Sequence, residues 1–143
     1  MMDRAALRDL LYEHDSDDID MPFWDACARG EFLVYRCGIC ERSYWPAAMC
    51  VQHGNRDMAW VAASGRGIVH DYVIMRHAYR PEHADRVPYN VSVIQLEEGP
   101  FFHSNVVDCP VDELRSGLAV DVVFEPHESG LTVPRFRRRD SQA

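Results

Sequence analysis

The segments RCGIC at residues 36–40 and MCVQHG at residues 49–54 decide how this chain folds. Each segment holds two possible metal ligands separated by two residues, and nine residues lie between the two pairs. Paired ligands at this spacing are typical of two metal-binding knuckles that face each other. Three thiolates and one imidazole complete a tetrahedral site, so we expect Cys37, Cys40, Cys50 and His53 to hold zinc. All four positions are then filled by protein, which indicates a structural rather than a catalytic metal.

The remaining histidines, serines and cysteines form no pattern that is typical of a catalytic site. No serine lies in a nucleophile-elbow motif, and no Cys–His pair outside the knuckles indicates an activated thiol. Cys27 and Cys109 lie in apolar surroundings, so we expect buried thiols rather than a disulfide. The other histidines lack metal-ligand spacing and are interpreted as surface residues: His14, His70, His77, His83, His103 and His127. We therefore expect no catalytic activity from this chain alone.

Charge and hydropathy exclude further classes of function. The 143 residues carry a net charge of −8, and all 15 basic residues are arginine. Such a chain repels polyanions, which argues against nucleic acid as a partner. No apolar run is long enough to span a membrane, and the N-terminal residues do not resemble a secretory signal. We expect a cytoplasmic protein made of one main domain and a small appendage.

Residues 1–34 are predicted to form an N-terminal helical arm. Asp3 can cap a first helix, whose apolar residues between Ala5 and Leu11 recur with a period near 3.6. Residues 13–20 are mostly charged and are interpreted as a solvated linker. A second helix is expected to begin at Pro22 and to end near Gly30.

The chain beyond this arm is predicted to be mainly β, with a zinc ribbon at residues 35–58 and a barrel domain at residues 59–143. A short strand at residues 31–36 leads into the first knuckle. A short helix or turn is expected from residue 112 to 117. Five strands are predicted for the barrel: 68–75, 89–96, 101–107, 119–125 and 131–137. Five strands with this insert fit a small Greek-key barrel, and the OB-fold is the leading candidate.

The order of these motifs resembles the zinc-ribbon/OB-fold proteins associated with acyl-CoA enzymes, long known as a domain of unknown function. The resemblance covers roughly residues 21–138. It is carried by the knuckles together with these segments: Phe23-Trp24, Tyr44-Trp45-Pro46, Gly65-Arg66-Gly67, Val87-Pro88-Tyr89, residues 104–107, residues 117–120 and Pro134-Arg135-Phe136. The resemblance implies a helical arm, a rubredoxin-like zinc ribbon and a C-terminal five-stranded OB-fold barrel.

The resemblance also implies an accessory role. Members of that family are small partners of thiolases, of acyltransferases and of the lipid-transfer-protein-like aldolases of steroid side-chain degradation, and the catalytic residues belong to the partner. The small subunit supports the complex, and a contribution to acyl-CoA binding is expected. Two features depart from the family pattern. His53 replaces the usual fourth cysteine at a competent offset, and Pro46-Ala47-Ala48 replaces a Pro-Pro-Arg link.

Two further groups of residues are candidates for binding. Guanidinium groups bind phosphates through paired hydrogen bonds, so CoA-binding residues are expected at Arg66 and in the basic cluster of Arg135, Arg137, Arg138 and Arg139. The alternative for this cluster is a solvated tail. The small segments around the ribbon cannot bury large rings alone. Either these rings pack against the barrel or they face a partner: Phe23, Trp24, Tyr44 and Trp45.

Three functions remain open from the sequence. The first is a non-catalytic subunit of a thiolase-superfamily enzyme that acts on acyl-CoA. The second is a stand-alone OB-fold that binds single-stranded nucleic acid, which needs a positive groove with stacking aromatic residues and conflicts with the net charge. The third is an enzyme that acts alone on CoA thioesters, and it lacks a nucleophile or a poised base.

Overall fold

The computed structural model describes Ala5 and residues 18–139, and it divides into two compact units. The first unit comprises the chain up to Ser64 together with Phe124–Pro134, and the second comprises Gly65–Val123 together with the chain from Arg135 on. His14 and the predicted first helix, apart from Ala5, lie outside the described residues. The predicted fold class is confirmed, because one N-terminal helix precedes a ribbon with a cysteine cluster and an OB-fold sheet.

The helix of the first unit, α2 (Met21–Ala28), follows a short 3-10 turn, η1 (Asp18–Asp20). Pro22 lies in its first turn, where the missing backbone N–H costs nothing. Gly30 follows the helix with a φ of 78°, the left-handed conformation that glycine adopts at helix ends. The predicted second helix is therefore confirmed. Among the described residues, no helix is long and apolar enough to cross a membrane.

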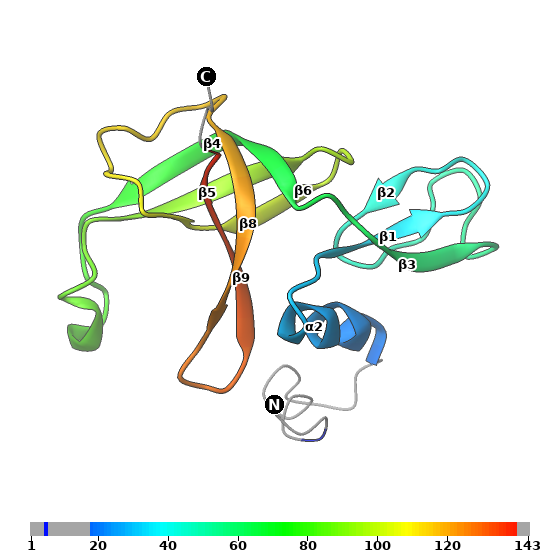
Figure 1. Ribbon diagram of the computed structural model, residues 1–143, viewed down its shortest axis with the longest axis horizontal. Helices are drawn as coiled ribbons and strands as arrows, with labels where there is room; N and C mark the ends of the chain where they lie inside the picture. Colours follow the sequence, from blue (N-terminus) through cyan, green and yellow to red (C-terminus); the bar gives the residue numbers. More distant parts are fainter. Residues whose placement is uncertain (1–4, 6–17, 140–143) are drawn as a thin grey trace. The chain divides into compact units, whose positions relative to one another are not determined.

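A three-stranded antiparallel sheet forms the ribbon of the first unit, with β1 (Leu33–Cys37) between β2 (Ser43–Tyr44) and β3 (Met58–Ala62). In Figure 1 the three strands form the cyan and green sheet. All five residues of β3 pair with β1, so the strand after the knuckles shares a sheet with the strand before them. The domain boundaries given above stay a prediction.

An aromatic cluster forms the core of the first unit. Phe23 on α2 is fully buried, and its ring centroid lies 5.1 Å from Trp24, 5.3 Å from Phe32, 5.3 Å from Trp45 and 6.1 Å from Trp60. Edge-to-face contacts at these distances stabilise a core beyond the burial of apolar area. The cluster thus joins α2, the link between the knuckles and β3 in one packing unit.

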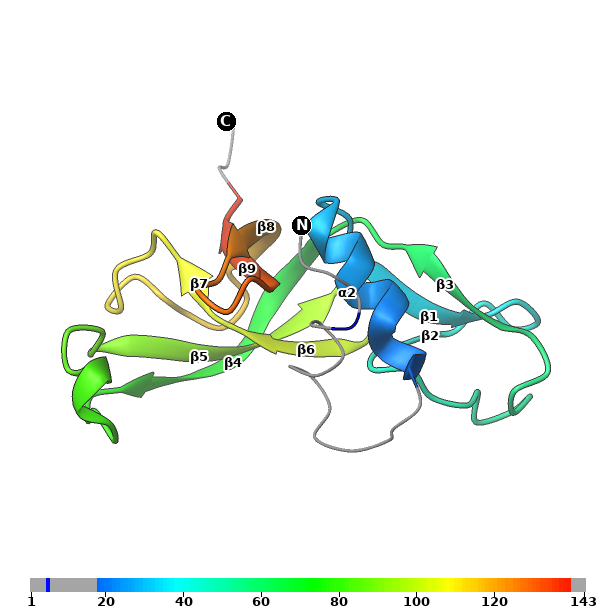
Figure 2. The ribbon, with the colours of Figure 1, turned by 90° about the horizontal axis from the view of Figure 1, so that it is seen from below.

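The remaining strands form a six-stranded sheet in the order β6-β5-β4-β8-β9-β7. Figure 2 shows its long hairpin, with β4 and β5 side by side. The 3-10 turn η2 (Pro81–His83) lies in the connection between these two strands. The strands are β4 (Arg66–Met75), β5 (Tyr89–Leu96), β6 (Phe101–Ser104), β7 (Val106–Val107), β8 (Ala119–Pro126) and β9 (Thr132–Arg138).

The segment predicted as one strand from residue 101 to 107 is two strands. β6 pairs with β5 in antiparallel fashion, whereas β7 pairs with β9 in parallel. The chain changes partner at Asn105, which brings the two ends of the sheet together as a barrel requires. Residues 112–117 contain turns and no helix, which is one of the two forms expected for this segment.

Asn90 joins β5 to β7 through its side chain. Its Nδ2 donates to the Val106 carbonyl at 2.8 Å, and its Oδ1 accepts from the Val106 N–H at 2.8 Å and from the Ser92 hydroxyl at 2.7 Å. Asn105 also donates to the Asn90 carbonyl. Asn90 is only 5% exposed, so these bonds satisfy backbone groups that would otherwise be buried without partners.

Candidate functional site

The two knuckles present their ligands through tight backbone turns. Cys37 ends β1, and its N–H donates to the Arg42 carbonyl while its own carbonyl accepts from the Glu41 N–H. In the second knuckle, Cys50 and Gly54 form a pair of backbone hydrogen bonds at 2.8 and 3.2 Å. Gly54 has a φ of 59°, which explains why glycine follows the fourth ligand.

The four ligand atoms lie within 4.8 Å of one another, so the structure brings all four sequence-predicted ligands together. Nδ1 of His53 is 3.6 Å from Sγ of both Cys37 and Cys50, and Sγ of Cys40 is 3.6 Å from Sγ of Cys50. A tetrahedral zinc site, with bonds of about 2.3 Å to sulfur and about 2.0 Å to nitrogen, separates its ligand atoms by about 3.5–3.8 Å. The donor set and its spacing therefore fit a metal ion of this kind.

The surroundings of the cluster act on the protonation of its thiols. Burial disfavours the Cys50 thiolate, but hydrogen bonds from the Gln52 N–H, the Tyr44 hydroxyl and His53 outweigh it and lower the pKa of Cys50 to about 5. The Arg42 N–H alone would lower the pKa of Cys40, but burial and the neighbouring thiols raise it on balance. Cys50 is thus prepared as a thiolate, the form that binds metal.

Tyr44 supports the second knuckle. Its hydroxyl accepts a hydrogen bond from the Val51 N–H at 3.1 Å, and the Arg42 guanidinium lies 5.7 Å from the centre of its ring. The sequence marks this residue only as one of several rings near the ribbon. Its contact with the knuckle depends on the pairing of β2 with β1, which places Tyr44 opposite Tyr35.

The other aromatic candidates differ in exposure. Phe23 is fully buried within its own unit, so it is not a surface residue of this chain. Trp24, Tyr44 and Trp45 are half-buried and keep part of their surface accessible. A role for these three rings in contacting a partner stays a prediction.

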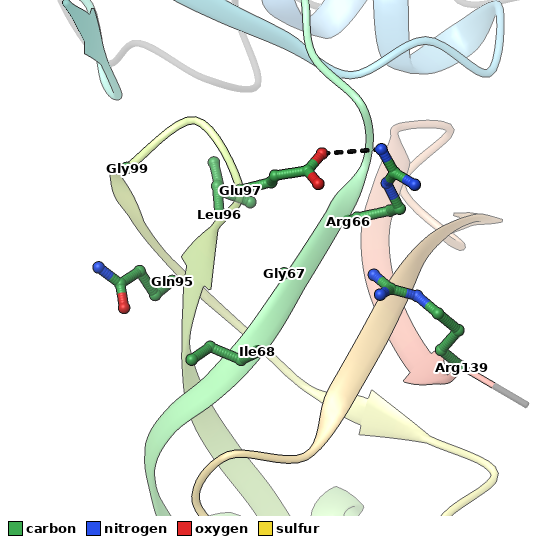
Figure 3. A pocket seen from close by; sticks show the side chains of 8 residues that line it. All are labelled: Arg66, Gly67, Ile68, Gln95, Leu96, Glu97, Gly99 and Arg139. Carbon is green, nitrogen blue, oxygen red and sulfur yellow. Dashed lines mark hydrogen bonds and ion pairs between the residues drawn. The ribbon is translucent and has the colours of Figure 1, made fainter. Parts of the chain in front are cut away.

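The second unit contains a pocket of about 310 Å³ on its six-stranded sheet. Figure 3 shows its lining: Arg66, Gly67, Ile68, Gln95, Leu96, Glu97, Gly99 and Arg139. Arg66 was expected as a ligand-binding residue, and the structure places it in this lining. Arg139, a member of the basic cluster at residues 135–139, is the second arginine of the pocket. Its position in the pocket cannot be predicted from the sequence, because it depends on pairing of the chain end with β8, where the Arg139 N–H donates to the Ala119 carbonyl.

Each pocket arginine has a carboxylate partner. Arg66 forms an ion pair with Glu97 at 3.0 Å, and both side chains are about half exposed. Nε of Arg139 donates to Asp121 at 2.8 Å, and its Nη2 donates to the Val120 carbonyl at 3.1 Å. The two guanidinium groups are therefore oriented by these contacts, and two acidic groups balance their charge.

The remaining arginine candidates do not line this pocket. Successive side chains of a strand point to opposite faces, so Arg135 and Arg137 lie on one face of β9. Arg138 lies on the other face and forms an ion pair with Glu113. The strand thus separates residues that look like one basic cluster in the sequence, and their expected role in CoA binding stays a prediction.

The two glycines beside Arg66 are required by packing. A Cβ at Gly67 would lie 2.7 Å from the Gln95 carbonyl oxygen and from Cγ2 of Ile94. At Gly65, a Cβ would lie 2.6 Å from Cγ1 of Val122, and the φ of 76° is also left-handed. The motif Gly65-Arg66-Gly67 thus brings β4 close to its neighbouring strands, and the missing side chain of Gly67 makes room for the Gln95 carbonyl and the Ile94 side chain.

Comparison with known proteins identifies relatives that match much of this chain. Residues 60–125 match the family model described as the C-terminal OB-fold domain of ChsH2. A scaffold protein of Methanothermobacter thermautotrophicus that contains a DUF35 domain is 30% identical over 91 residues, which are 62% of this chain and 68% of that protein. A probable enoyl-CoA hydratase alpha subunit of Thermomonospora curvata is 31% identical over 120 residues. Those residues are 82% of this chain but only 37% of the Thermomonospora protein.

Solved structures with the same fold as this protein include the following two chains. A chain of the Ltp2-ChsH2(DUF35) aldolase superposes with a TM-score of 0.76 and 26% identity, covering 87% of this chain and 98% of that one. A protein of unknown function from the DUF35 family of Sulfolobus solfataricus superposes with a TM-score of 0.57 and 12% identity, over 94% of each chain. The second likeness concerns the fold alone.

Proposed function

Because the chain belongs to the DUF35 family, we propose that it is a non-catalytic accessory subunit of a thiolase-like enzyme. The main support is the similarity to one chain of the Ltp2-ChsH2(DUF35) aldolase, because the present protein covers 98% of that chain. In that assembly a protein of this architecture occurs together with Ltp2. The ribbon and the OB-fold sheet would serve as a scaffold that binds the catalytic partner.

The substrate of the proposed complex is an acyl-CoA, of the kind formed in the degradation of fatty acids or of steroid side chains. This finer assignment rests on the resemblance described for the sequence and on the CoA-related name of one relative. The catalytic groups for the reaction would come from the partner. This chain would contribute to assembly and to holding the CoA ester.

Zinc is the metal that we propose for Cys37, Cys40, Cys50 and His53. The support is the donor set of three sulfurs and one nitrogen at tetrahedral spacing. Zinc bound there would link the two knuckles and would supply folding free energy rather than chemistry. Metal analysis of protein purified without added zinc tests this: we expect about one zinc per chain, and folded protein free of metal would contradict it.

A second candidate partner follows from the Thermomonospora relative, which is named as a probable enoyl-CoA hydratase alpha subunit. The small subunit would then work with a hydratase rather than with a thiolase-like aldolase. Both candidates keep the accessory role and differ only in the catalytic partner.

Co-expression with each candidate partner tests the proposed function. The tagged chain is expected to recover a thiolase-like protein as a stoichiometric complex that survives size-exclusion chromatography, and recovery of a hydratase instead would favour the second candidate. An unrelated thiolase from the same host serves as the control. Failure to bind either partner, combined with salt-sensitive binding to single-stranded oligonucleotides, would contradict the proposal and would favour the nucleic-acid alternative.

A further inference from the structure

We propose that the pocket between Arg66 and Arg139 binds a phosphoryl group, and that Glu97 occupies the anion's position on Arg66 when no ligand is bound. The inference rests on the proposed function, because CoA esters carry phosphates. It names the pocket of this chain that binds one of these phosphates.

The first support is the placement of two guanidinium groups at one pocket. Arg66 lies at the start of β4, and Arg139 follows β9 at the end of the described chain. Figure 3 shows both groups on the β8 side of β4, with Glu97 reaching Arg66 from the β5 side. Two forked donors at one pocket are the arrangement that suits a phosphate with several acceptor oxygens.

The second support is the exposure of the ion pair between Arg66 and Glu97. The two side chains are 54% and 52% exposed, and exposed pairs of this kind contribute little to stability. A phosphoryl group carries more negative charge than a carboxylate and offers more acceptor atoms. A phosphoryl group can therefore displace the Glu97 carboxylate from Arg66. Asp121 and the Val120 carbonyl keep Arg139 in place during this exchange.

The third support is a row of side chains beside the pocket that is apolar at both ends. Ile68 pairs with Gln95 across β4 and β5, and Gln95 pairs with Phe101 across β5 and β6. Residues that are paired across a sheet point to the same face, so the three side chains form one row. Ile68 is 41% and Phe101 is 45% exposed. A ligand larger than free phosphate thus finds apolar surface beside the anion site.

The experiment compares the pocket pair with a matched pair elsewhere on the same unit. Arg80 and Glu82 form another exposed ion pair, with 73% and 63% exposure, outside the pocket lining. The four variants are Arg66→Gln, Glu97→Gln, Arg80→Gln and Glu82→Gln. Each pocket variant has a control with the same change of net charge, which removes the effect of the overall field. Circular dichroism and melting curves verify that each variant is folded.

Binding is followed by NMR titration of the full chain at constant ionic strength with CoA, dephospho-CoA, pyrophosphate and inorganic phosphate. We expect Arg66→Gln to weaken CoA binding by about tenfold, and Glu97→Gln to strengthen it by about threefold because the internal competitor is lost. The control variants are expected to change affinity by less than about twofold. Pocket variants that change affinity no more than their controls would overturn the inference.

The probes distinguish the possible sources of the phosphoryl group. Equal dependence on Arg66 for CoA and for inorganic phosphate supports a site for phosphoryl groups in general, and dependence for CoA alone supports a site for the CoA ester. Recovery of the catalytic partner by the Arg66→Gln variant is measured separately. Loss of phosphate binding with intact assembly supports the inference, whereas failure of the wild-type chain to assemble contradicts the proposed function and leaves the pocket result standing.

Discussion

At the scale of a single residue, His53 tests whether the cluster is a metal site. Its Nδ1 lies 3.6 Å from two thiol sulfurs, so replacing it removes one of four ligands. We expect His53→Ala to lose bound metal and to lower the free energy of unfolding by more than about 4 kcal/mol, because loss of a metal site is among the causes of the largest single-mutation effects. His53→Cys restores a sulfur ligand and is expected to keep the metal.

Elemental analysis and thermal melting check the prediction for His53. The matched control is His103→Ala, because His103 is an exposed histidine on β6, outside the cluster. A His53→Ala variant that binds one metal per chain and melts with the wild type would show that the imidazole is not a ligand.

Cys27 makes a second prediction at the residue scale. It is 1% exposed on α2, and burial raises its pKa to about 12. The thiolate, which is the reactive form, is therefore almost absent at pH 8. We expect Cys27 to remain unmodified by iodoacetamide in the native protein and to react when the chain is unfolded, as read by peptide mass spectrometry.

Cys109 provides the comparison for Cys27. It is partly accessible, although burial also raises its pKa, so slow modification in the native protein is expected there. The pKa shift of Cys27 has a consequence for stability as well. The folded state favours the neutral thiol of Cys27. The contribution of this thiol to the free energy of unfolding is therefore complete below about pH 9 and is lost as the pH rises towards 12. Rapid native labelling of Cys27 at pH 8 would contradict its burial.

At the scale of the element, Asn90 is the residue that connects β5 to β7. Asn90→Ala removes the three side-chain hydrogen bonds described above and leaves the N–H and carbonyl of Val106 without these partners. We expect a loss of about 2–4 kcal/mol in the free energy of unfolding, since each buried group left unsatisfied costs about 1–3 kcal/mol. Urea denaturation measures the change.

Ser92→Ala is the matched control for Asn90→Ala, because it removes only the hydroxyl that donates to Asn90. A loss of about 1 kcal/mol is expected for it, the typical value of one hydrogen bond. If both variants unfolded at the same denaturant concentration, the side chain of Asn90 would not hold the two strands together.

At the scale of the whole molecule, metal removal is expected to change the hydrogen-exchange protection of one compact unit and not of the other. The cluster lies in the unit that contains α2 and the ribbon, while β4, β5 and β6 belong to the other. A chelator is therefore expected to remove hydrogen-exchange protection from β1 and β3 and to leave β4 and β5 protected, because local stability follows local contacts. Simultaneous loss of protection in all four strands would show that the units unfold together.

Part of the fold and of the candidate site could be predicted from the sequence because it depends on local spacing. The two-residue gaps within each knuckle place both ligands of a pair on one tight turn, so Cys37 and Cys40 are recognisable without any tertiary information. The alternation of β5 and the turn residues after it are local in the same sense. Pro22 and Gly30 likewise mark the ends of α2 through their own backbone preferences.

Other features were decided only by tertiary structure, because they depend on contacts between distant residues. The change of strand partner at Asn105 requires β5 and β9, and nothing in residues 101–107 indicates it. Arg66 meets Glu97 across 31 positions of sequence. Arg139 reaches Asp121, while Arg138 turns to Glu113 on the other face of the chain. Strand register sets these distances, and register is a property of the packed sheet rather than of any single segment.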